Sequence, residues 1–199
     1  MAYPLLWNSI QFDPSLGRVP GRPALTRRLS DLRAAFVNQS ACDQILNLGD
    51  PAVYQVTQIE DQEGEGQLHY GLGIIMPGKV GDEYYMTKGH LHAWRPAAEV
   101  YIGLQGQGFM LLEDERTGKS TALPLSADRV VYVPGHTAHR TINTGNEALV
   151  YWGILSSQAG HDYGAKDRYD FRKVIVEIDG EPVVLDRDQY VDRLKADKR

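Results

Sequence analysis

From residue 53 onward the chain is divided into short runs of β-branched and aromatic residues, with turn-forming residues between them. The runs are Val53–Ile59, Gln67–Met76, Glu99–Leu104, Gly108–Glu113, Thr121–Leu125, Arg129–Val133, Arg140–Asn143 and Leu149–Leu155. Such runs are typical of strands, and the 20 glycines and 10 prolines of the chain supply many turns. The pattern therefore predicts an all-β barrel or sandwich.

The N-terminal part of the chain lacks this pattern. Residues 1–22 are expected to form an irregular arm, because prolines interrupt them and no periodicity is visible. Pro23 is expected to open a helix, since apolar residues then recur at helical spacing, with Arg27 and its charged neighbours on the other side. The apolar residues are Leu25, Leu29, Leu32 and Phe36.

The C-terminal part is expected to add a hairpin and a short helix. Val174–Ile178 and Val183–Leu185 are joined through Asp179-Gly180, a dipeptide that favours a tight hairpin turn. Asp186–Arg199 is charged and is expected to form a short helix that frays at its end.

The length of 199 residues indicates one large domain. We expect this single domain to comprise an N-terminal arm and helix over 1–49, a barrel core over 50–170, and a C-terminal hairpin and tail over 171–199.

Composition and charge exclude several classes of protein. The single cysteine, Cys42, excludes an internal disulfide and a multi-cysteine zinc site. A net charge of −5 argues against a nucleic-acid binder, and no run approaches the ~20 apolar residues of a membrane-spanning helix. Met1 to Gln11 lacks the features of a signal peptide, so a cytoplasmic location is expected.

Histidines and one glutamate form a candidate metal site. His90 and His92 are two residues apart, so on a strand they point to the same side. Glu99 begins the next predicted strand, and His139 follows a Pro-Gly turn. Two or three imidazoles with one carboxylate suit iron, nickel, manganese or zinc. A His-x-His pair taken alone is more often two half-exposed strand residues, so the pair needs support from its context.

That context resembles the cupin family. Gly89-His90-Leu91-His92, Glu99 and Gly106 are similar to the first cupin motif, with a longer gap than usual before the glutamate. Residues 128–143 are similar to the second motif. In that second motif Asp128 and His136 stand where glycines are usual, and only His139 has the spacing of the ligand.

Four blocks resemble, more specifically, the cupin-type glucose-6-phosphate isomerases first described from archaea. The blocks are Pro77–His92, Ala98–Tyr101, Ala138–Gly145 and Gly160–Gly164. The resemblance implies an antiparallel jelly-roll barrel that interconverts glucose 6-phosphate and fructose 6-phosphate in glycolysis and gluconeogenesis. It also implies a homodimer, with no nucleic-acid or membrane partner, and one divalent transition metal per chain, iron first among the candidates.

The same resemblance implies roles for particular residues. The metal ligands would be His90, His92, Glu99 and His139. Glu99 would also be the candidate catalytic base, although a carboxylate bound to a cation is a weakened base. The substrate-binding residues would be Thr87, Gly89, Tyr101, His161 and Tyr163.

Some points stay open at the level of sequence. His136 and Leu155 stand where aromatic residues are common in the family. The Lys88 side chain is expected to point either toward the substrate or outward. Neither a cis-enediol path nor a hydride shift is favoured. The alternative functions are a cupin dioxygenase or another sugar-converting cupin, and a non-enzymatic sugar-binding cupin. A phosphorylated substrate would need a local cationic or metal-bearing site in this acidic chain.

Overall fold

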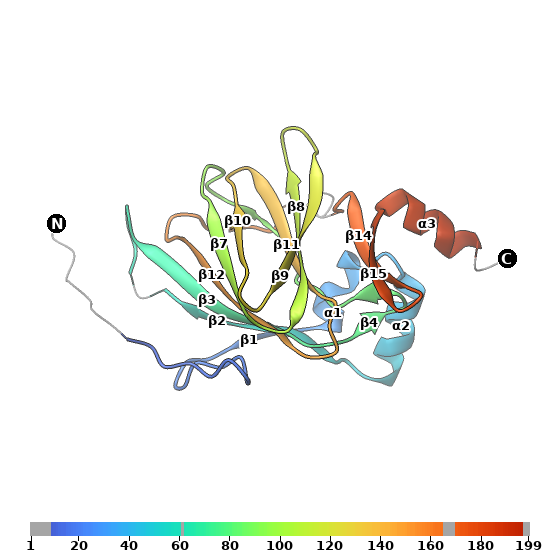
Figure 1. The fold of residues 1–199 in the computed structure, drawn as a ribbon, viewed down its shortest axis with the longest axis horizontal. Helices are drawn as coiled ribbons and strands as arrows, with labels where there is room; N and C mark the ends of the chain where they lie inside the picture. Colours follow the sequence, from blue (N-terminus) through green and yellow to red (C-terminus); the bar gives the residue numbers. More distant parts are fainter. Residues whose placement is uncertain (1–8, 61, 165–169, 197–199) are drawn as a thin grey trace.

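The computed structural model describes residues 9–60, 62–164 and 170–196, and most of its elements are strands (Figure 1). The largest sheet is antiparallel and six-stranded. Its strands, in spatial order, are β1 (Leu25–Arg28), β2 (Ala52–Ile59), β3 (Leu68–Ile75), β12 (Leu149–Ser156), β7 (Glu99–Gln105) and β10 (Val130–Val133).

Three smaller sheets complete the fold. The three-stranded sheet contains β11 (Thr137–Asn143), β8 (Gln107–Asp114) and β9 (Ser120–Ser126). The two-stranded sheet pairs β13 (His161–Asp162) with β6 (Leu91–His92). The four-stranded sheet contains β15 (Glu181–Asp186), β14 (Lys173–Ile178), β5 (Glu83–Tyr84) and β4 (Lys79–Val80).

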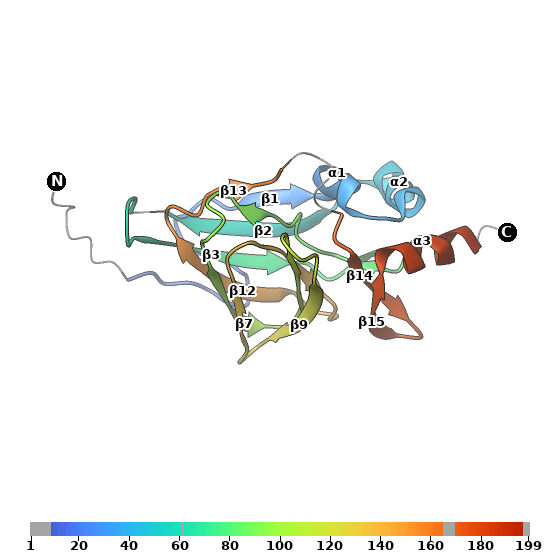
Figure 2. The same cartoon turned by 90° about the horizontal axis from the view of Figure 1, so that it is seen from above.

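The main core lies between the six-stranded and three-stranded sheets, which Figure 2 shows from above. Tyr101 and Tyr151 come from the first sheet, and Met110 and Ile142 from the second. Gly73 makes room for the Tyr151 ring, because a Cβ at this position would lie 2.4 Å from that ring. The expected all-β class with antiparallel strands is confirmed, but the strand ladders of the described residues do not close into a continuous barrel.

A second apolar cluster covers part of the outer face of the six-stranded sheet. It contains Ile74 and Val150, with Phe12 from the N-terminal arm packed against it. The rings of Phe12 and Trp152 meet edge to face, 5.2 Å apart. The described part of the arm therefore binds the sheet through apolar contacts.

The prediction of a helix that begins at Pro23 is wrong. Leu25–Arg28 forms β1, which pairs with β2, and only the single turn α1 (Leu29–Leu32) and the 3-10 turn η1 (Arg33–Ala35) follow. The apolar spacing reflected real burial, since Leu29, Leu32 and Phe36 are fully buried. Pairing with the edge of the sheet outweighed the helical pattern in the first four residues.

The main N-terminal helix is instead α2 (Gln39–Leu48), whose first turn is capped by Asn38 Oδ1 accepting from the Ala41 amide at 3.0 Å. Near the C-terminus, β14 and β15 form the expected hairpin, and α3 (Arg187–Ala196) follows it. No helix among the described residues has the length and apolarity that a membrane span requires.

Candidate metal and substrate site

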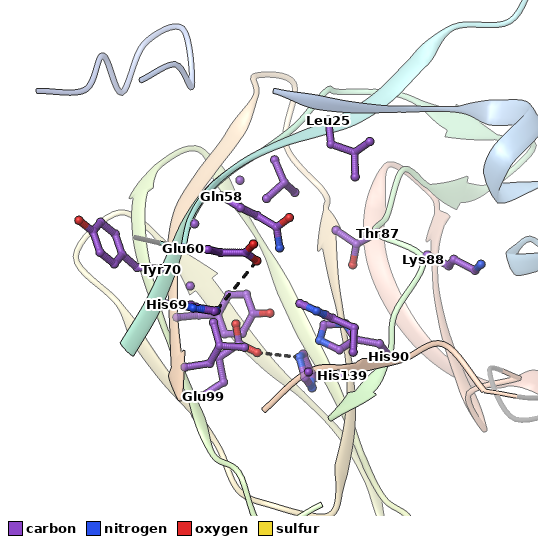
Figure 3. Close-up of a pocket in the computed structure, with 18 of the residues that line it drawn as sticks. Leu25, Gln58, Glu60, His69, Tyr70, Thr87, Lys88, His90, Glu99 and His139 are labelled. Carbon is purple, nitrogen blue, oxygen red and sulfur yellow. Dashed lines mark ion pairs between the residues drawn. The ribbon is translucent and has the colours of Figure 1, made fainter. Parts of the chain in front are cut away.

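A cavity of about 320 Å³ opens against the inner face of the six-stranded sheet (Figure 3). One wall comes from the inward-facing residues of β2, β3, β7 and β12. The other wall comes from residues 87–90, β11 and the segment that includes β13. The cavity is therefore enclosed by parts of the chain that are far apart in sequence.

Four predicted metal ligands converge at the floor of this cavity. Ligand atoms of His90, His92, Glu99 and His139 all lie within 4.8 Å of one another. His90 and His139 are neighbours because their backbones form an isolated antiparallel bridge, with N–O distances of 3.2 and 3.0 Å. Glu99 is the first residue of β7.

Hydrogen bonds to backbone carbonyls fix two of these imidazole rings. His92 Nδ1 donates to the Ala97 carbonyl at 3.0 Å, and His139 Nδ1 donates to the Thr137 carbonyl at 3.1 Å. Because a carbonyl only accepts, each ring carries a proton on Nδ1, which leaves Nε2 as the nitrogen that faces Glu99 and can bind a metal. Such a bond on the far nitrogen is the usual support of a metal-binding histidine.

The Nε2 atoms point at one carboxylate. Those of His92 and His139 lie 3.1 and 3.0 Å from Oε2 of Glu99. Nε2 of His90 is buried without a hydrogen-bond partner among the described residues, and the contact of His139 Nε2 with Glu99 lacks the geometry of a hydrogen bond. Three imidazoles and one carboxylate that converge in a buried cluster fit a divalent transition metal.

Electrostatics favour the metal-binding forms of Glu99 and His90. Burial by itself would raise the pKa of Glu99, but the adjoining His139 and His92 imidazoles outweigh it and hold that pKa well below its ordinary range. Burial, together with the neighbouring His139, lowers the pKa of His90 well below 6.5. At neutral pH the glutamate is therefore ionised and the His90 ring is neutral.

Tyr101 lies beside the cluster. Its hydroxyl donates to Glu99, and its ring lies 5.8 Å from that of His139. Burial and then the Glu99 charge raise the pKa of Tyr101 well above 10, so its phenol keeps its proton. Tyr101 therefore orients the carboxylate and lines the cavity next to it.

The segment Thr87–Gly89 forms one side of the cavity. The Thr87 hydroxyl accepts a hydrogen bond from the Thr141 amide at 3.1 Å, which leaves its own proton free to donate into the cavity. Gly89 has a φ of +78°, and a Cβ there would lie 2.8 Å from Phe171, so this close approach requires glycine. Arg140 supports the segment from behind by donating to the Lys88 carbonyl at 2.8 Å.

His161 and Tyr163 cover the cavity near the metal ligands. The His161 ring centroid lies 4.6 Å from that of His90, and Tyr163 stacks on His161 at 5.8 Å. The register of β13 explains this position, because His161 pairs directly with His92. All the predicted substrate-binding residues therefore line the same cavity as His90, Glu99 and His139.

His136 and Leu155, the two departures from the family pattern, lie in different places. His136 is outside the cavity lining, and its Nδ1 lies 2.9 Å from Glu115 Oε1 near the surface. His136 and Asp128 have φ values of +61° and +65°, which explains why glycines are usual at these motif positions. Leu155 lines the cavity, where it offers no polar group.

Several cavity residues were missed by sequence reasoning. Arg27 and Tyr54 face each other across β1 and β2, and Glu60, Glu63 and His69 lie together at another side of the cavity. None belongs to a motif block. Only the register of the sheet places them, so the sequence offered no signal for them.

Comparisons with known proteins agree with one another. A family model described as glucose-6-phosphate isomerase matches residues 26–192. A glucose-6-phosphate isomerase of Thermococcus kodakarensis is 42% identical over 181 residues, covering 91% of this chain and 95% of that protein. The protein of the same name from Pyrococcus abyssi is 40% identical with the same coverage. One from Sinorhizobium medicae is 35% identical, covering 79% of this chain and 74% of its own length.

Among solved structures, an oxalate oxidase in complex with the substrate analogue glycolate superposes with a TM-score of 0.46. The two chains are 15% identical, and the match covers 55% of this chain and 54% of the other.

Proposed function

Because this chain belongs to the glucose-6-phosphate isomerase family, we propose that it interconverts glucose 6-phosphate and fructose 6-phosphate. The observation that carries the proposal is the joint presence of a four-ligand cluster and the motif-borne substrate residues around one cavity. A family match over residues 26–192 includes every one of these residues. The activity places the chain in glycolysis and gluconeogenesis.

One divalent metal ion per chain would be held by His90, His92, Glu99 and His139. When bound, the ion supplies Lewis-acid polarisation of the C1 and C2 oxygens of the open sugar. Iron is our first candidate, and nickel, manganese and zinc suit the same three imidazoles and one carboxylate.

Glu99 is our candidate for moving the proton. On the enediol path a base takes the C2 proton of glucose 6-phosphate and returns it at C1. Glu99 faces the cavity in ionised form, and Tyr101 holds its carboxylate in place. Its low pKa makes it a weak base, so the hydride shift, which needs no base at carbon, remains the competing path.

The isotope in the product distinguishes the two paths. We expect that conversion of glucose 6-phosphate in D₂O places deuterium at C1 of the product if Glu99 exchanges the proton with solvent. Mass spectrometry or NMR of product from the first turnovers measures this. Complete retention of the original hydrogen would contradict a base role for Glu99 and support the hydride shift.

The substrate would lie between the metal ligands and the Thr87–Gly89 segment. His161, Tyr163 and Tyr101 would surround the reacting end of the sugar, because they lie beside His90 and Glu99. The Thr87 hydroxyl and the Gly89 amide are donors for the phosphate group, because both lie on a rigid segment that lines the cavity.

We further propose that the protein is a homodimer that acts as a single-domain subunit in the cytoplasm. The outer face of the six-stranded sheet exposes Val130 and Tyr132, at 65% and 59%, on its edge strand β10. Beside them on β7 lie Ile102 and Val100, which are half-buried. An apolar stripe of this kind suits a second copy of the chain. A cytoplasmic location follows from a charged phosphosugar substrate.

Turnover of the phosphosugar tests the proposed activity. We expect the purified, metal-loaded chain to convert fructose 6-phosphate to glucose 6-phosphate in an assay coupled to an NADP-dependent dehydrogenase. The His92→Ala variant, which lacks one of the four ligands, is the matched control and should be inactive. Failure of the metal-loaded wild type to convert the substrate would contradict the proposal.

A further inference from the structure

One positive side chain reaches the cavity from the N-terminal strand. Arg27 on β1 lies opposite Tyr54 of β2 in the sheet register, and both residues line the cavity. Arg27 is half-buried, whereas its neighbour Arg28 is exposed. The apolar spacing after Pro23 predicted Arg27 on the outer side of a helix, so its place in the cavity depends entirely on the pairing of β1 with β2.

The Tyr54 hydroxyl lies near both Arg27 and the Thr87–Gly89 segment. Burial raises the pKa of Tyr54, whereas the Lys88 backbone and the Arg27 guanidinium act to lower it. Arg27, Tyr54 and Thr87 also line the same cavity. The Arg27 guanidinium is therefore close to the side of the cavity that carries the Thr87 hydroxyl.

No carboxylate of the described residues forms a salt bridge with Arg27, whereas Arg33 and Arg95, for example, each have one. Lys88 also lines the cavity, with Nζ 5.1 Å from the Tyr163 ring centroid. The guanidinium thus keeps donors that the protein does not satisfy with an acid.

The opposite side of the cavity is acidic. Glu60 and Glu63 lie 4.0 and 3.3 Å from the two ring nitrogens of His69. Figure 3 shows Glu60 and His69 at the left of the cavity, and Thr87 and Lys88 at the right. Like charges repel, so a phosphate dianion is disfavoured beside these glutamates. Among the described lining residues, the cations are Arg27 and Lys88, which lie away from these glutamates.

We infer that Arg27 is the charged donor to the phosphate group of the substrate, and that it makes the site selective for phosphorylated sugars. The planar guanidinium offers two parallel, charged donors that match a phosphate, whereas the Thr87 hydroxyl and the Gly89 amide are neutral donors. This inference rests on the proposed function, since it assigns one more residue to the same substrate.

Equilibrium binding to the metal-loaded protein tests the inference without turnover. The probes are 6-phosphogluconate, whose C1 carboxylate cannot be isomerised, and gluconate, which lacks the phosphate. The variant is Arg27→Gln. The matched control is Arg28→Gln, which removes the same charge from the adjacent residue, whose guanidinium donates to the Asp50 carbonyl at 2.6 Å. Calorimetry gives each affinity, and circular dichroism checks the fold.

We expect Arg27→Gln to weaken binding of 6-phosphogluconate by about 10- to 100-fold, as for other hydrogen bonds to charged groups. Gluconate binding and the Arg28→Gln variant should match wild type. For turnover of fructose 6-phosphate, KM should rise more than kcat falls.

Three results would overturn the inference. The first is that Arg27→Gln binds 6-phosphogluconate as tightly as the wild-type protein does. The second is that Arg27→Gln loses the same affinity for 6-phosphogluconate as for gluconate. The third is that the wild-type protein does not bind 6-phosphogluconate. If Arg27→Gln does not fold, Arg27→Lys replaces it, and an affinity less than about threefold weaker would count against the paired donors. A wild type that binds 6-phosphogluconate but does not isomerise fructose 6-phosphate would contradict the proposed function alone.

Discussion

His136 and His139 are three residues apart, and their surroundings separate their roles. His139 is 1% exposed and has its Nε2 3.0 Å from Glu99, whereas His136 lies outside the cavity beside Glu115. We predict that His139→Ala lowers metal affinity by at least about 100-fold, since even residues that support metal ligands contribute about 10- to 100-fold. His136→Ala should leave the affinity unchanged. Competition with a metal indicator measures both, and equal losses in the two variants would show that His136 also binds the ion.

Thr87 and His161 are residues whose removal should affect substrate and not metal. We predict that Thr87→Ala and His161→Ala each lower kcat/KM for fructose 6-phosphate by about 10- to 150-fold, which corresponds to about 1.5–3 kcal/mol for a hydrogen bond to a charged group. Metal content should stay the same. Thr121→Ala, on the exposed strand β9, is the matched control.

Steady-state kinetics with phosphorylated and unphosphorylated fructose check this prediction. The prediction would be contradicted if both variants had the kinetics of the wild-type protein. It would also be contradicted if the wild-type protein converted the two sugars equally well.

At this scale the sequence predicted residues that the fold brings together, namely the four candidate ligands and the motif residues of the cavity, but it did not predict Arg27 and Tyr54. His90 and His92 share a side of the chain because of local geometry, which a two-residue spacing reveals. Arg27 and Tyr54 enter the cavity only through the register of β1 on β2. A register between distant strands depends on the complete fold, so no local pattern could predict these two residues.

At the scale of elements, β5 and α2 are connected through a buried carboxylate. Glu83 is 2% exposed, and it accepts hydrogen bonds from the amides of Val37 and Asn38 at 2.8–3.0 Å. Burial raises the pKa of Glu83 above 4.5, and the two amides offset only part of that effect. Since its folded pKa exceeds the unfolded one, its contribution to stability is complete below pH 4.5 and is lost as pH rises through the folded pKa.

We therefore predict that Glu83→Gln, which cannot ionise, gains stability relative to wild type as pH rises from about 4 to 8. Urea unfolding of metal-free protein measures the free energy of unfolding at each pH. Glu177→Gln is the control with the opposite sign, because the Lys79 ammonium lowers the pKa of Glu177. A difference between Glu83→Gln and wild type that does not change with pH, or that falls as pH rises, would contradict the prediction.

The strands could be predicted from sequence more closely than the N-terminal elements. Runs of β-branched and aromatic residues alternate with turns from β2 to β15, and local preference agrees there with the final sheets. Between Leu25 and Phe36 the same apolar residues fit a helix, but β1 pairs with β2 and only one helical turn remains. Tertiary pairing decided this segment, and its pattern alone could not show that.

At the scale of the whole molecule, the proposed homodimer would form through the exposed outer face of the six-stranded sheet. We predict that Tyr132→Asp converts the homodimer to a monomer, because a buried charge without a partner at an apolar interface is unfavourable. Leu48→Asp is the matched control, since Leu48 is 93% exposed on α2, apart from this face. Light scattering after gel filtration gives the mass. A monomeric wild type, or a dimeric Tyr132→Asp, would contradict the proposed interface.

Metal removal and return tests the central claim most directly, which is that His90, His92, Glu99 and His139 hold an ion on which isomerisation depends. The measurement follows the rate of fructose 6-phosphate conversion together with metal content by elemental analysis, before chelation, after chelation and during titration with a divalent transition metal. We predict that chelation abolishes the rate, and that the rate returns in proportion to bound metal and reaches its plateau at about one ion per chain. Full activity of the metal-free protein, or a folded protein that binds no stoichiometric transition metal, would contradict this claim.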